Sequence, residues 1–374
     1  MMRRHLFLLG FFPLLVLSDC ECGYMVRSPD REDGAWVFAD MLETDFTQTE
    51  DIATNGDWVR QGFNVTAEAG RGEYGKAFLP DNVFSHRTSA TGSGTDAGVQ
   101  LRVRSLVSGT DMVPVAELDT SRRDLHWGSF RAGMKLAEVE GTCAAFFWYF
   151  NDTQEIDMEF LSREFDHARG VYPVHLVIQT RDALAAGFNA QNTDTYKQVN
   201  LAFDPTAGFH EYRFDYLPGR VIFYADSEKL AEMEGSAMPS SAGHLILQHW
   251  SNGNPQWSGG PPVQDALLTV SYVKAYFSSL DATLRETTKD ECSAEDNDGA
   301  VCIVPDGVAV NASTGGWFIS RDGDPSRNKE GTVGNDGDDS ESGAASPDCN
   351  EGSVAIKVMA MAVSLVGSIA LALL

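Results

Sequence analysis

The sequence predicts an all-β fold, a sandwich or jelly roll that residues 24–280 form as one domain. Two observations carry this prediction. Short runs of alternating apolar and polar residues follow one another along this range, separated by Gly, Asn, Asp and Pro. Long amphipathic windows with a helical period are scarce, and no internal repeat is present. Many short strands over roughly 250 residues are typical of a two-layer β domain.

The strand candidates are runs in which apolar and polar side chains alternate, or in which β-branched and aromatic residues dominate. They lie at residues 99–103, 154–161, 212–216, 221–224, 244–250 and 268–276. Pro218 and Gly219 stand between two of these runs and predict the turn of a β-hairpin, because both residue types favour turn conformations. The best short helical window is residues 226–234.

The N-terminus has the form of a secretory signal peptide. Arg3 and Arg4 precede Leu6–Leu17, a run of about a dozen mostly apolar residues, and Ser18 offers a cleavage site. A membrane anchor is the alternative, but a run of this length is too short to span a bilayer comfortably. We therefore expect residues 1–18 to be a signal peptide and the protein to be secreted.

The C-terminus is also apolar. Val354–Leu374 contains one charge, Lys357, and a short polar spacer and small residues at 342–346 precede it. This order predicts a GPI-attachment signal over residues 346–374, with a tail-end transmembrane helix as the alternative. Residues 281–345, rich in Asp, Glu, Gly and Ser, are predicted to form an acidic stalk. The protein would then sit at the cell surface, anchored by lipid to the outer leaflet or held in the cell wall.

Composition narrows the class of partner. The net charge of −26 argues against binding to nucleic acid. The 21 Phe, 10 Tyr and 7 Trp residues suit a neutral ligand that stacks on aromatic rings, such as a polysaccharide. We expect a monomer. Three sequons predict N-glycosylation at Asn64, Asn151 and Asn311.

The cysteine pattern fits structural disulfides outside the cell. The six cysteines are Cys20, Cys22, Cys143, Cys292, Cys302 and Cys349. They allow 15 pairings, which the sequence does not resolve. Our first expectation is a bridge from an N-terminal cysteine to Cys143, the one cysteine in the middle of the domain. The Cys and His spacings do not resemble a zinc site, so we predict no metal ligands.

The most informative segment is Gln154–Leu161, in which three carboxylates alternate with large apolar residues. On a β-strand, Glu155, Asp157 and Glu159 would share one face. The alternative is an ordinary strand with one solvated face. However, no basic residue in this window neutralises the three acids, and such crowding raises the pKa of at least one of them. Two carboxylic side chains flanking a sugar linkage are the usual machinery of glycoside hydrolysis.

Gly141–Phe150 followed by Glu155–Leu161 resembles the catalytic strand region of glycoside hydrolase family 16. Other segments that resemble the family in the same order are residues 126–130, 209–214, 249–253 and 257–262. The resemblance covers roughly residues 24–280, and the segment Cys20–Tyr24 resembles secreted fungal members. It implies a concanavalin A-like β-jelly roll whose concave sheet binds glycans.

The resemblance also implies residue roles in a retaining mechanism. Glu155 would be the nucleophile, Glu159 the general acid/base and Asp157 the assistant between them. Backbones four residues apart lie about 13 Å apart along a strand, whereas retention needs carboxyl groups about 5–5.5 Å apart. The two side chains must therefore lean together on a curved sheet. Where many members have a Glu and an Arg, this chain has Arg131 and Gly133, which leaves the exact glucan open.

Substrate-binding candidates follow the same segments. Trp148, Trp250 and Trp257 could stack on sugar rings, and Asn252 could bind a sugar hydroxyl. The alternatives are a core position for Trp148 and a turn role for Asn252. We expect His175 and His249 to be structural. A structural calcium occurs in parts of the family, but the sequence assigns no ligands to one, and we predict no cofactor.

These observations predict a retaining, endo-acting hydrolase of cell-wall β-glucan with β-1,3 or mixed β-1,3/1,4 linkages. A GPI-anchored transglycosylase that remodels glucan or joins chitin to glucan is the first alternative, since a tethered enzyme suits work on the producer's own wall. A non-catalytic, lectin-like glycan-binding protein on the same fold is the second. The three intact carboxylates argue against it.

Overall fold

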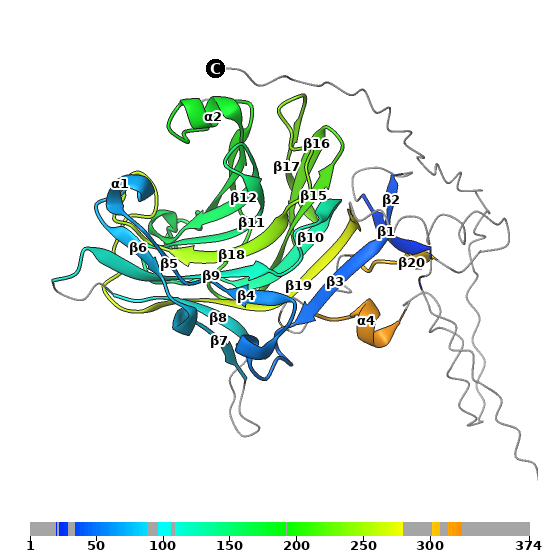
Figure 1. Ribbon diagram of the computed structural model, residues 1–374, viewed down its shortest axis with the longest axis horizontal. Helices are drawn as coiled ribbons and strands as arrows, with labels where there is room; N and C mark the ends of the chain where they lie inside the picture. The colour runs from blue at the N-terminus through cyan, green and yellow to red at the C-terminus, as the bar shows by residue number, and fades with distance from the viewer. Residues whose placement is uncertain are drawn as a thin grey trace, which may run out of the picture. The chain divides into compact units, whose positions relative to one another are not determined.

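The computed structural model describes residues 20, 22–28, 34–87, 96–105, 109–191, 193–279, 301–306, 313 and 315–323. The predicted signal peptide, the lipid-attachment signal and Asn311 lie outside these residues. Strands dominate the described part of the chain (Figure 1), and the all-β prediction is confirmed. Its helices are all short: η1 (Ile52–Thr54), α1 (Ala67–Gly70), η2 (Pro80–Asn82), η3 (Ser162–Glu164), α2 (Arg181–Ala185) and α4 (Ile319–Asp322). None of these described helices has the length and apolarity needed to cross a bilayer.

One large sheet contains the predicted carboxylate strand, and we call it the carboxylate sheet. Its strands, in order, are β14 (Tyr196–Asn200), β13 (Pro173–Gln179), β12 (Gln154–Leu161), β11 (Cys143–Asn151), β18 (His244–Trp250), β9 (Met112–Thr120), β6 (Gly75–Phe78) and β5 (Phe63–Val65), with β4 (Trp58–Arg60) paired to β9. Strand β12 is antiparallel to both its neighbours, so its acids lie well inside the sheet.

The second large sheet, which we call the back sheet, packs against the first (Figure 1). Its strands, in order, are β17 (Glu228–Glu234), β16 (Arg220–Ala225), β15 (His210–Leu217), β10 (Leu125–Lys135), β19 (Ala266–Ser279), β8 (Gly98–Val103) and β7 (Val83–His86), with β3 (Asp40–Asp45) paired to β19. The predicted hairpin is present as β15–β16, with Leu217 opposite Arg220 and Gly219 at φ 71°. The helix predicted over 226–234 is wrong, because 228–234 form β17 along β16.

The core lies between the two sheets. β11 and β12 contribute every second side chain to it, including Phe146, Trp148 and Met158. Trp148 is fully buried, its indole N–H donates to the Leu125 carbonyl at 2.9 Å, and its ring centroid lies 4.9 Å from that of Tyr216. The prediction that Trp148 contacts sugar is therefore wrong, because it lies one residue out of phase with the carboxylate face.

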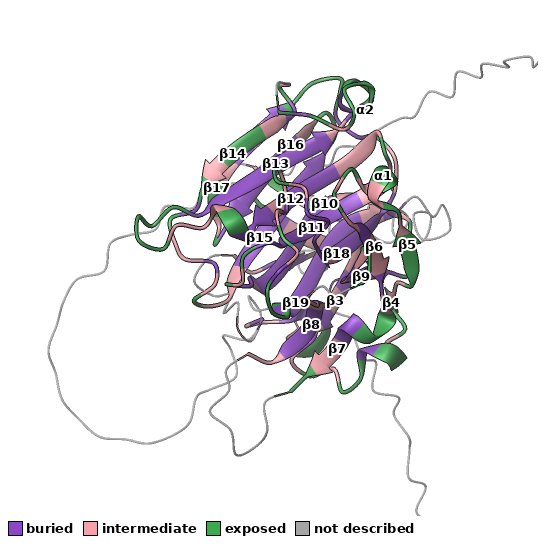
Figure 2. Cartoon of the chain, turned by 90° about the vertical axis from the view of Figure 1, so that its left-hand side faces the viewer, coloured by how far each residue is buried: buried purple, intermediate pink, exposed green. Residues whose placement is uncertain are grey.

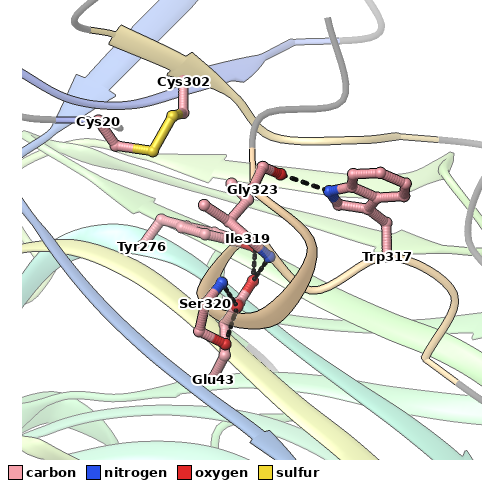
Figure 3. The surroundings of a disulfide bond; sticks show 8 residues. All are labelled: Cys20, Glu43, Tyr276, Cys302, Trp317, Ile319, Ser320 and Gly323. Atoms are coloured by element: carbon pink, nitrogen blue, oxygen red, sulfur yellow. Dashed lines mark hydrogen bonds between the residues drawn. A yellow bond between two sulfur atoms is a disulfide. The ribbon is translucent and has the colours of Figure 1, made fainter. Parts of the chain in front are cut away.

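A small third sheet brings together the two ends of the described chain. Its strands, in order, are β2 (Ala35–Phe38), β1 (Gly23–Arg27) and β20 (Val301–Ile303). A disulfide joins Cys20 to Cys302 (Figure 3). Cys143 is free and buried. The expected bridge to Cys143 is thus wrong, because Cys143 lies on the carboxylate sheet and Cys20 packs with Cys302 in a separate apolar cluster.

The C-terminal segment beyond β20 also packs on the domain. The Glu43 carboxylate accepts hydrogen bonds from the backbone N–H groups of Ile319 and Ser320 (Figure 3). The ammonium group of Lys274 on β19 donates to the carbonyls of Gly315 and Trp317. The described parts of residues 301–323 are therefore attached to the domain, which differs from the stalk predicted to begin at residue 281.

Arg131, one of the two departures from the family pattern, lies on the outer face of the back sheet. Its guanidinium is 2.8 Å from the Asp306 carboxylate and donates to the Pro305 carbonyl at 3.0 Å. Gly133 shares that face, where an added Cβ would meet the Tyr272 ring at 2.4 Å. Both positions therefore lie on the face of the back sheet that is turned away from the carboxylate sheet.

Two of the three sequons lie in the described part of the chain. Asn64 is exposed on β5. Asn151 is half-buried at the end of β11, and its side-chain oxygen accepts hydrogen bonds from the backbone and hydroxyl of Thr153 at 3.0 Å. Glycosylation at these positions stays a prediction.

Candidate active site

The three acids of β12 lie on the face of the sheet turned away from the core, because Ile156, Met158 and Phe160 fill the opposite face. Asp157 is only 4% exposed, whereas Glu155 and Glu159 on either side of it are half-buried. Figure 2 shows the middle strands of this sheet as largely buried and the marginal strand β14 as more exposed. The two outer carboxylates can therefore be reached by a ligand, while the central one supports them.

The same face of the neighbouring strands is unusually polar. Strand register places Tyr149 and Gln179 beside Glu155, and Ala145 and His175 beside Glu159. The cross-strand pairing places six further polar residues on this face: Glu117, Asp119, Tyr196, Gln198, His244 and Gln248. Sequence reasoning missed this set. The alternation within residues 244–250 could have revealed His244 and Gln248, but which strands lie next to β12 depends on long-range pairing.

The side chains of Glu155 and Asp157 are hydrogen-bonded to each other. Burial and the neighbouring carboxylates raise the pKa of Asp157 well above its ordinary value, so this group is the protonated member. Burial raises the pKa of Glu155 to about 7, and the hydrogen bond that Glu155 accepts from the Asp157 O–H acts against this rise. A neutral Asp157 thus helps to keep Glu155 charged, which is what a nucleophilic carboxylate needs.

Glu159 has a different environment. The indole N–H of Trp257 donates to Oε2 at 3.1 Å, and the thiol of Cys143 lies 3.4 Å from Oε1. Burial raises the pKa of Glu159, while His175 and these two donors act in the opposite direction. A carboxyl group whose pKa is raised can hold a proton near neutral pH and deliver it to a leaving group.

His175 links this region to β14 and to the η3 turn. Its Nε2 lies 2.8 Å from Glu164 Oε2, its Nδ1 lies 2.8 Å from the Tyr196 hydroxyl, and its ring centroid is 4.9 Å from that of Trp257. It is buried and hydrogen-bonded, as a structural histidine would be, yet it stands directly beside Glu159. His249 lies in the interior, where burial lowers its pKa to about 4.

The predicted sugar ligands beyond Trp257 lie at the edge of the site or inside the protein. Asn252 is 1% exposed, its amide donates to the Gly70 carbonyl at 2.6 Å, and its oxygen accepts from the Ser258 hydroxyl at 3.0 Å. It holds a loop together, so its predicted sugar contact is wrong. Trp250 is 9% exposed, and the Lys76 ammonium lies 4.4 Å from the centroid of its ring, which limits sugar access to that face.

Lys76 belongs to a second polar group that the sequence did not reveal. Burial raises the pKa of Glu117 to about 7, and the Gln248 amide donates a hydrogen bond to it. Burial lowers the pKa of Lys76, while Glu117, Cys143 and Glu159 act against that change. This group places a cation close to the acids.

The carboxylate sheet bends toward this face. Helix α1 joins β5 to β6 near one margin of the sheet, and α2 joins β13 to β14 at the other. Arg71, next to α1, donates to the Gly187 carbonyl at 2.9 Å and lies 4.3 Å from the Phe188 ring centroid, just after α2. This contact joins segments next to the two margins of the sheet, and the positive charge of Arg71 acts to lower the pKa of Glu155.

No group of three or more His, Cys, Asp or Glu side chains in the described ranges is arranged to hold a metal ion.

Comparison with known proteins identifies the family. Residues 89–274 match the sequence profile described as Glycosyl hydrolases family 16. These residues form a glycoside hydrolase family 16 domain. An endo-β-1,3-glucanase from Pyrococcus furiosus shares the fold, with a TM-score of 0.50, 15% identity, and coverage of 68% of this chain and 98% of that one. The family assignment includes β12 and its three acids.

Two sequence relatives of the family 16 domain are informative. A β-glucanase from Bacillus licheniformis is 27% identical over 158 residues, which cover 40% of this chain and 58% of that protein. Crh-like protein 2 from Botryotinia fuckeliana is 25% identical over 168 residues, covering 40% of this chain and 34% of that protein. The chain thus spans about a third to somewhat over half of the length of these relatives.

Proposed function

We propose that the protein is a retaining, endo-acting glycosidase that cleaves β-glucan with β-1,3 or mixed β-1,3/1,4 linkages. The observation that carries the proposal is the arrangement on β12, where the half-buried Glu155 and Glu159 lie on either side of the buried Asp157. The family 16 match and the β-glucanase relative support the substrate class.

In the first step, Glu155 attacks the anomeric carbon of the sugar while Glu159 donates its proton to the oxygen of the leaving chain. The C–O bond to the leaving chain breaks, and an ester bond forms between the sugar and Glu155. The hydrogen bond from Asp157 stabilises the Glu155 carboxylate before the attack.

In the second step, Glu159 is a carboxylate and acts as a base. It removes a proton from water, the resulting oxygen attacks the anomeric carbon, and Glu155 leaves as a carboxylate. Two inversions give net retention of configuration. The N–H of Trp257 and the S–H of Cys143 are hydrogen-bond donors that suit the charged form of Glu159 in this step.

The alternative is a transglycosylase, in which a sugar hydroxyl replaces water in the second step. The similarity to Crh-like protein 2 supports this transglycosylase alternative. A lectin-like protein is disfavoured, because a binding surface has no need of three neighbouring buried or half-buried acids whose charges repel each other. Secretion and a lipid anchor at the cell surface are part of the proposal and rest on the sequence of the two termini.

The test is incubation of the purified protein with β-1,3-glucan, mixed-linkage glucan and chitin, each with and without a fluorescent oligosaccharide acceptor. We expect internal cleavage of a β-glucan, with new reducing ends of β configuration. Labelled products longer than the acceptor would assign the protein to transfer, and shortening alone would assign it to hydrolysis. If the protein neither shortens nor joins any of the glycans, the proposal fails.

A further inference from the structure

We propose that Trp257 and Cys143 are positioning residues for Glu159, and that together they fix the orientation and the charge state of its carboxyl group. The inference rests on the proposed function of Glu159 as the general acid/base. Each residue supplies one hydrogen-bond donor to a different carboxylate oxygen, the indole N–H to Oε2 at 3.1 Å and the thiol to Oε1 at 3.4 Å. With both oxygens held, rotation of the carboxyl group about its terminal bond is restricted.

Strand pairing explains how Cys143 reaches Glu159. Ala145 on β11 lies directly opposite Glu159 on β12, and Cys143 lies two residues further along on the same face. Diagonal neighbours of this kind are within reach of each other across a sheet. The small side chain of Ala145 leaves the carboxyl group free to turn toward the thiol. The carbonyl of Ala144, at 3.7 Å, is a more distant and uncharged alternative acceptor for the S–H.

Cys143 is suited to donate and not to react. It is free and fully buried, and burial raises the pKa of its thiol well above the ordinary value. A thiol with a raised pKa stays protonated over the working range of an enzyme, so its S–H remains available to the carboxylate. The nearby negative charge of Glu159 acts in the same direction.

Trp257 is held in place by several contacts. Its backbone N–H donates to the Asn254 carbonyl at 3.0 Å, its own carbonyl accepts from Arg163 Nε at 2.5 Å, and its ring lies against His175. The indole N–H is thereby directed at Glu159. Sequence reasoning assigned this residue a sugar-stacking role, whereas its polar edge is committed to the acid/base residue.

Other charged and titratable groups interact electrostatically with Glu159 from neighbouring strands. They are Lys76 on β6, Glu155 and Asp157 on β12, His175 on β13 and Tyr196 on β14. Burial favours the protonated form of Glu159, whereas Lys76, His175 and the two donors favour the carboxylate. Donors to a charged carboxylate lower its pKa, so removal of either donor should raise the pKa of Glu159.

The sign of the effect on activity follows from the mechanism. Glu159 must be protonated in the first step, so kcat/KM falls as pH rises through the pKa of Glu159. A higher pKa moves this basic limb to higher pH. Loss of one donor also frees the carboxyl group to rotate, which lowers kcat in both steps without changing how substrate binds.

The experiment uses three substitutions in the full chain. Cys143→Val removes the donor with little change of volume, Trp257→Phe removes the N–H but keeps an aromatic ring, and Cys143→Ser keeps a donor. The pKa of Glu159 is measured by carbon NMR of protein labelled at the Glu carboxyl carbons, with the signal assigned by its loss in Glu159→Gln. The pH profile of kcat/KM on β-glucan is recorded in parallel.

We expect the pKa of Glu159 and the basic limb to rise by about half a unit to one unit in Cys143→Val and in Trp257→Phe, with kcat down about tenfold and KM unchanged. Cys143→Ser should restore the parent values. An unchanged pKa in both donor-free variants would overturn the inference, even if their activity fell, because altered packing can lower activity without any loss of a hydrogen bond to Glu159.

The two proposals fail separately. One outcome is that the pKa of Glu159 rises as expected in the variants while the parent protein acts on no glycan. In that case Cys143 and Trp257 do hydrogen-bond to Glu159, but the proposed function fails. If the parent cleaves β-glucan but the pKa of Glu159 does not move, the positioning role fails and the function stands. Thermal unfolding of each variant checks that it is folded, and the two donor-free substitutions test the inference independently of each other.

Discussion

Glu155→Gln is expected to lower the turnover of β-glucan at least a thousandfold, which corresponds to about 4 kcal/mol of lost transition-state stabilisation. The amide is close to the carboxylate in shape but is a much weaker nucleophile, so the glycosyl ester cannot form. Because Glu155 is half-buried beside Asp157, the neutral amide should fit without disturbing the strand. Initial rates of reducing-end release by the parent and the variant give the ratio directly.

The matched control for this substitution is Glu138→Gln, which makes the same chemical change at an exposed position outside the strands. We expect the control to keep parent-like turnover and both variants to unfold at temperatures close to that of the parent. Equal turnover by Glu155→Gln and the parent would remove Glu155 from the reaction.

Glu159→Ala should separate the acid/base role from the nucleophilic one. Cleavage of polysaccharide is expected to fall about 10²- to 10⁴-fold, because the leaving chain is no longer protonated. An aryl glycoside with an acidic phenol as leaving group should still transfer its sugar to Glu155, since such a phenolate departs without a proton. Water then attacks the ester slowly, because no base is present at position 159.

Added azide provides the decisive comparison for this variant. Azide needs no base, so it should attack the anomeric carbon, displace Glu155 and give a glycosyl azide of β configuration with a faster overall rate. In Glu155→Ala, azide would instead occupy the place of the missing nucleophile and give the α product. An α product from Glu159→Ala would mean that the two roles are exchanged.

The sequence predicted the carboxylate face well, because alternation along one strand is a local property. Glu155, Asp157 and Glu159 differ from their apolar neighbours so clearly that a single period-2 pattern places them. Strand β11 carries no such signal: from Cys143 to Phe150 its residues are all apolar, so nothing local shows which of them face the core. Trp148 was misplaced for this reason.

Contacts between distant parts of the chain were beyond sequence reasoning. The Cys20–Cys302 bridge joins residues 282 positions apart, and the acidic composition around Cys302 indicates a stalk. The few apolar residues in that region are among those that pack on the domain, including Val304 and Phe318. Local composition reports only the average polarity of a segment. A few apolar side chains are enough to attach a largely polar segment to the domain.

The polar neighbours of Glu159 were missed for a related reason. His175 lies beside it through strand register, and Trp257 reaches it from a loop almost one hundred residues further along the chain, a sequence separation of 98. Nothing at residue 257 distinguishes an indole that hydrogen-bonds a carboxylate from one that stacks on sugar. Similarly, the sequence around Asn252 is compatible with a turn residue and with a sugar ligand. Only the buried hydrogen bonds of its side chain decide between the two roles.

The central claim is that a sugar becomes covalently attached to Glu155. The direct measurement is mass spectrometry of the protein after incubation with a 2-deoxy-2-fluoro glucosyl donor carrying a good leaving group, which slows release of the ester more than its formation. The account predicts one added sugar per protein, located by fragmentation of the β12 peptide on Glu155 and absent from Glu155→Gln. An added sugar on Glu159 or Asp157, or none at all while the same protein cleaves β-glucan, would contradict it.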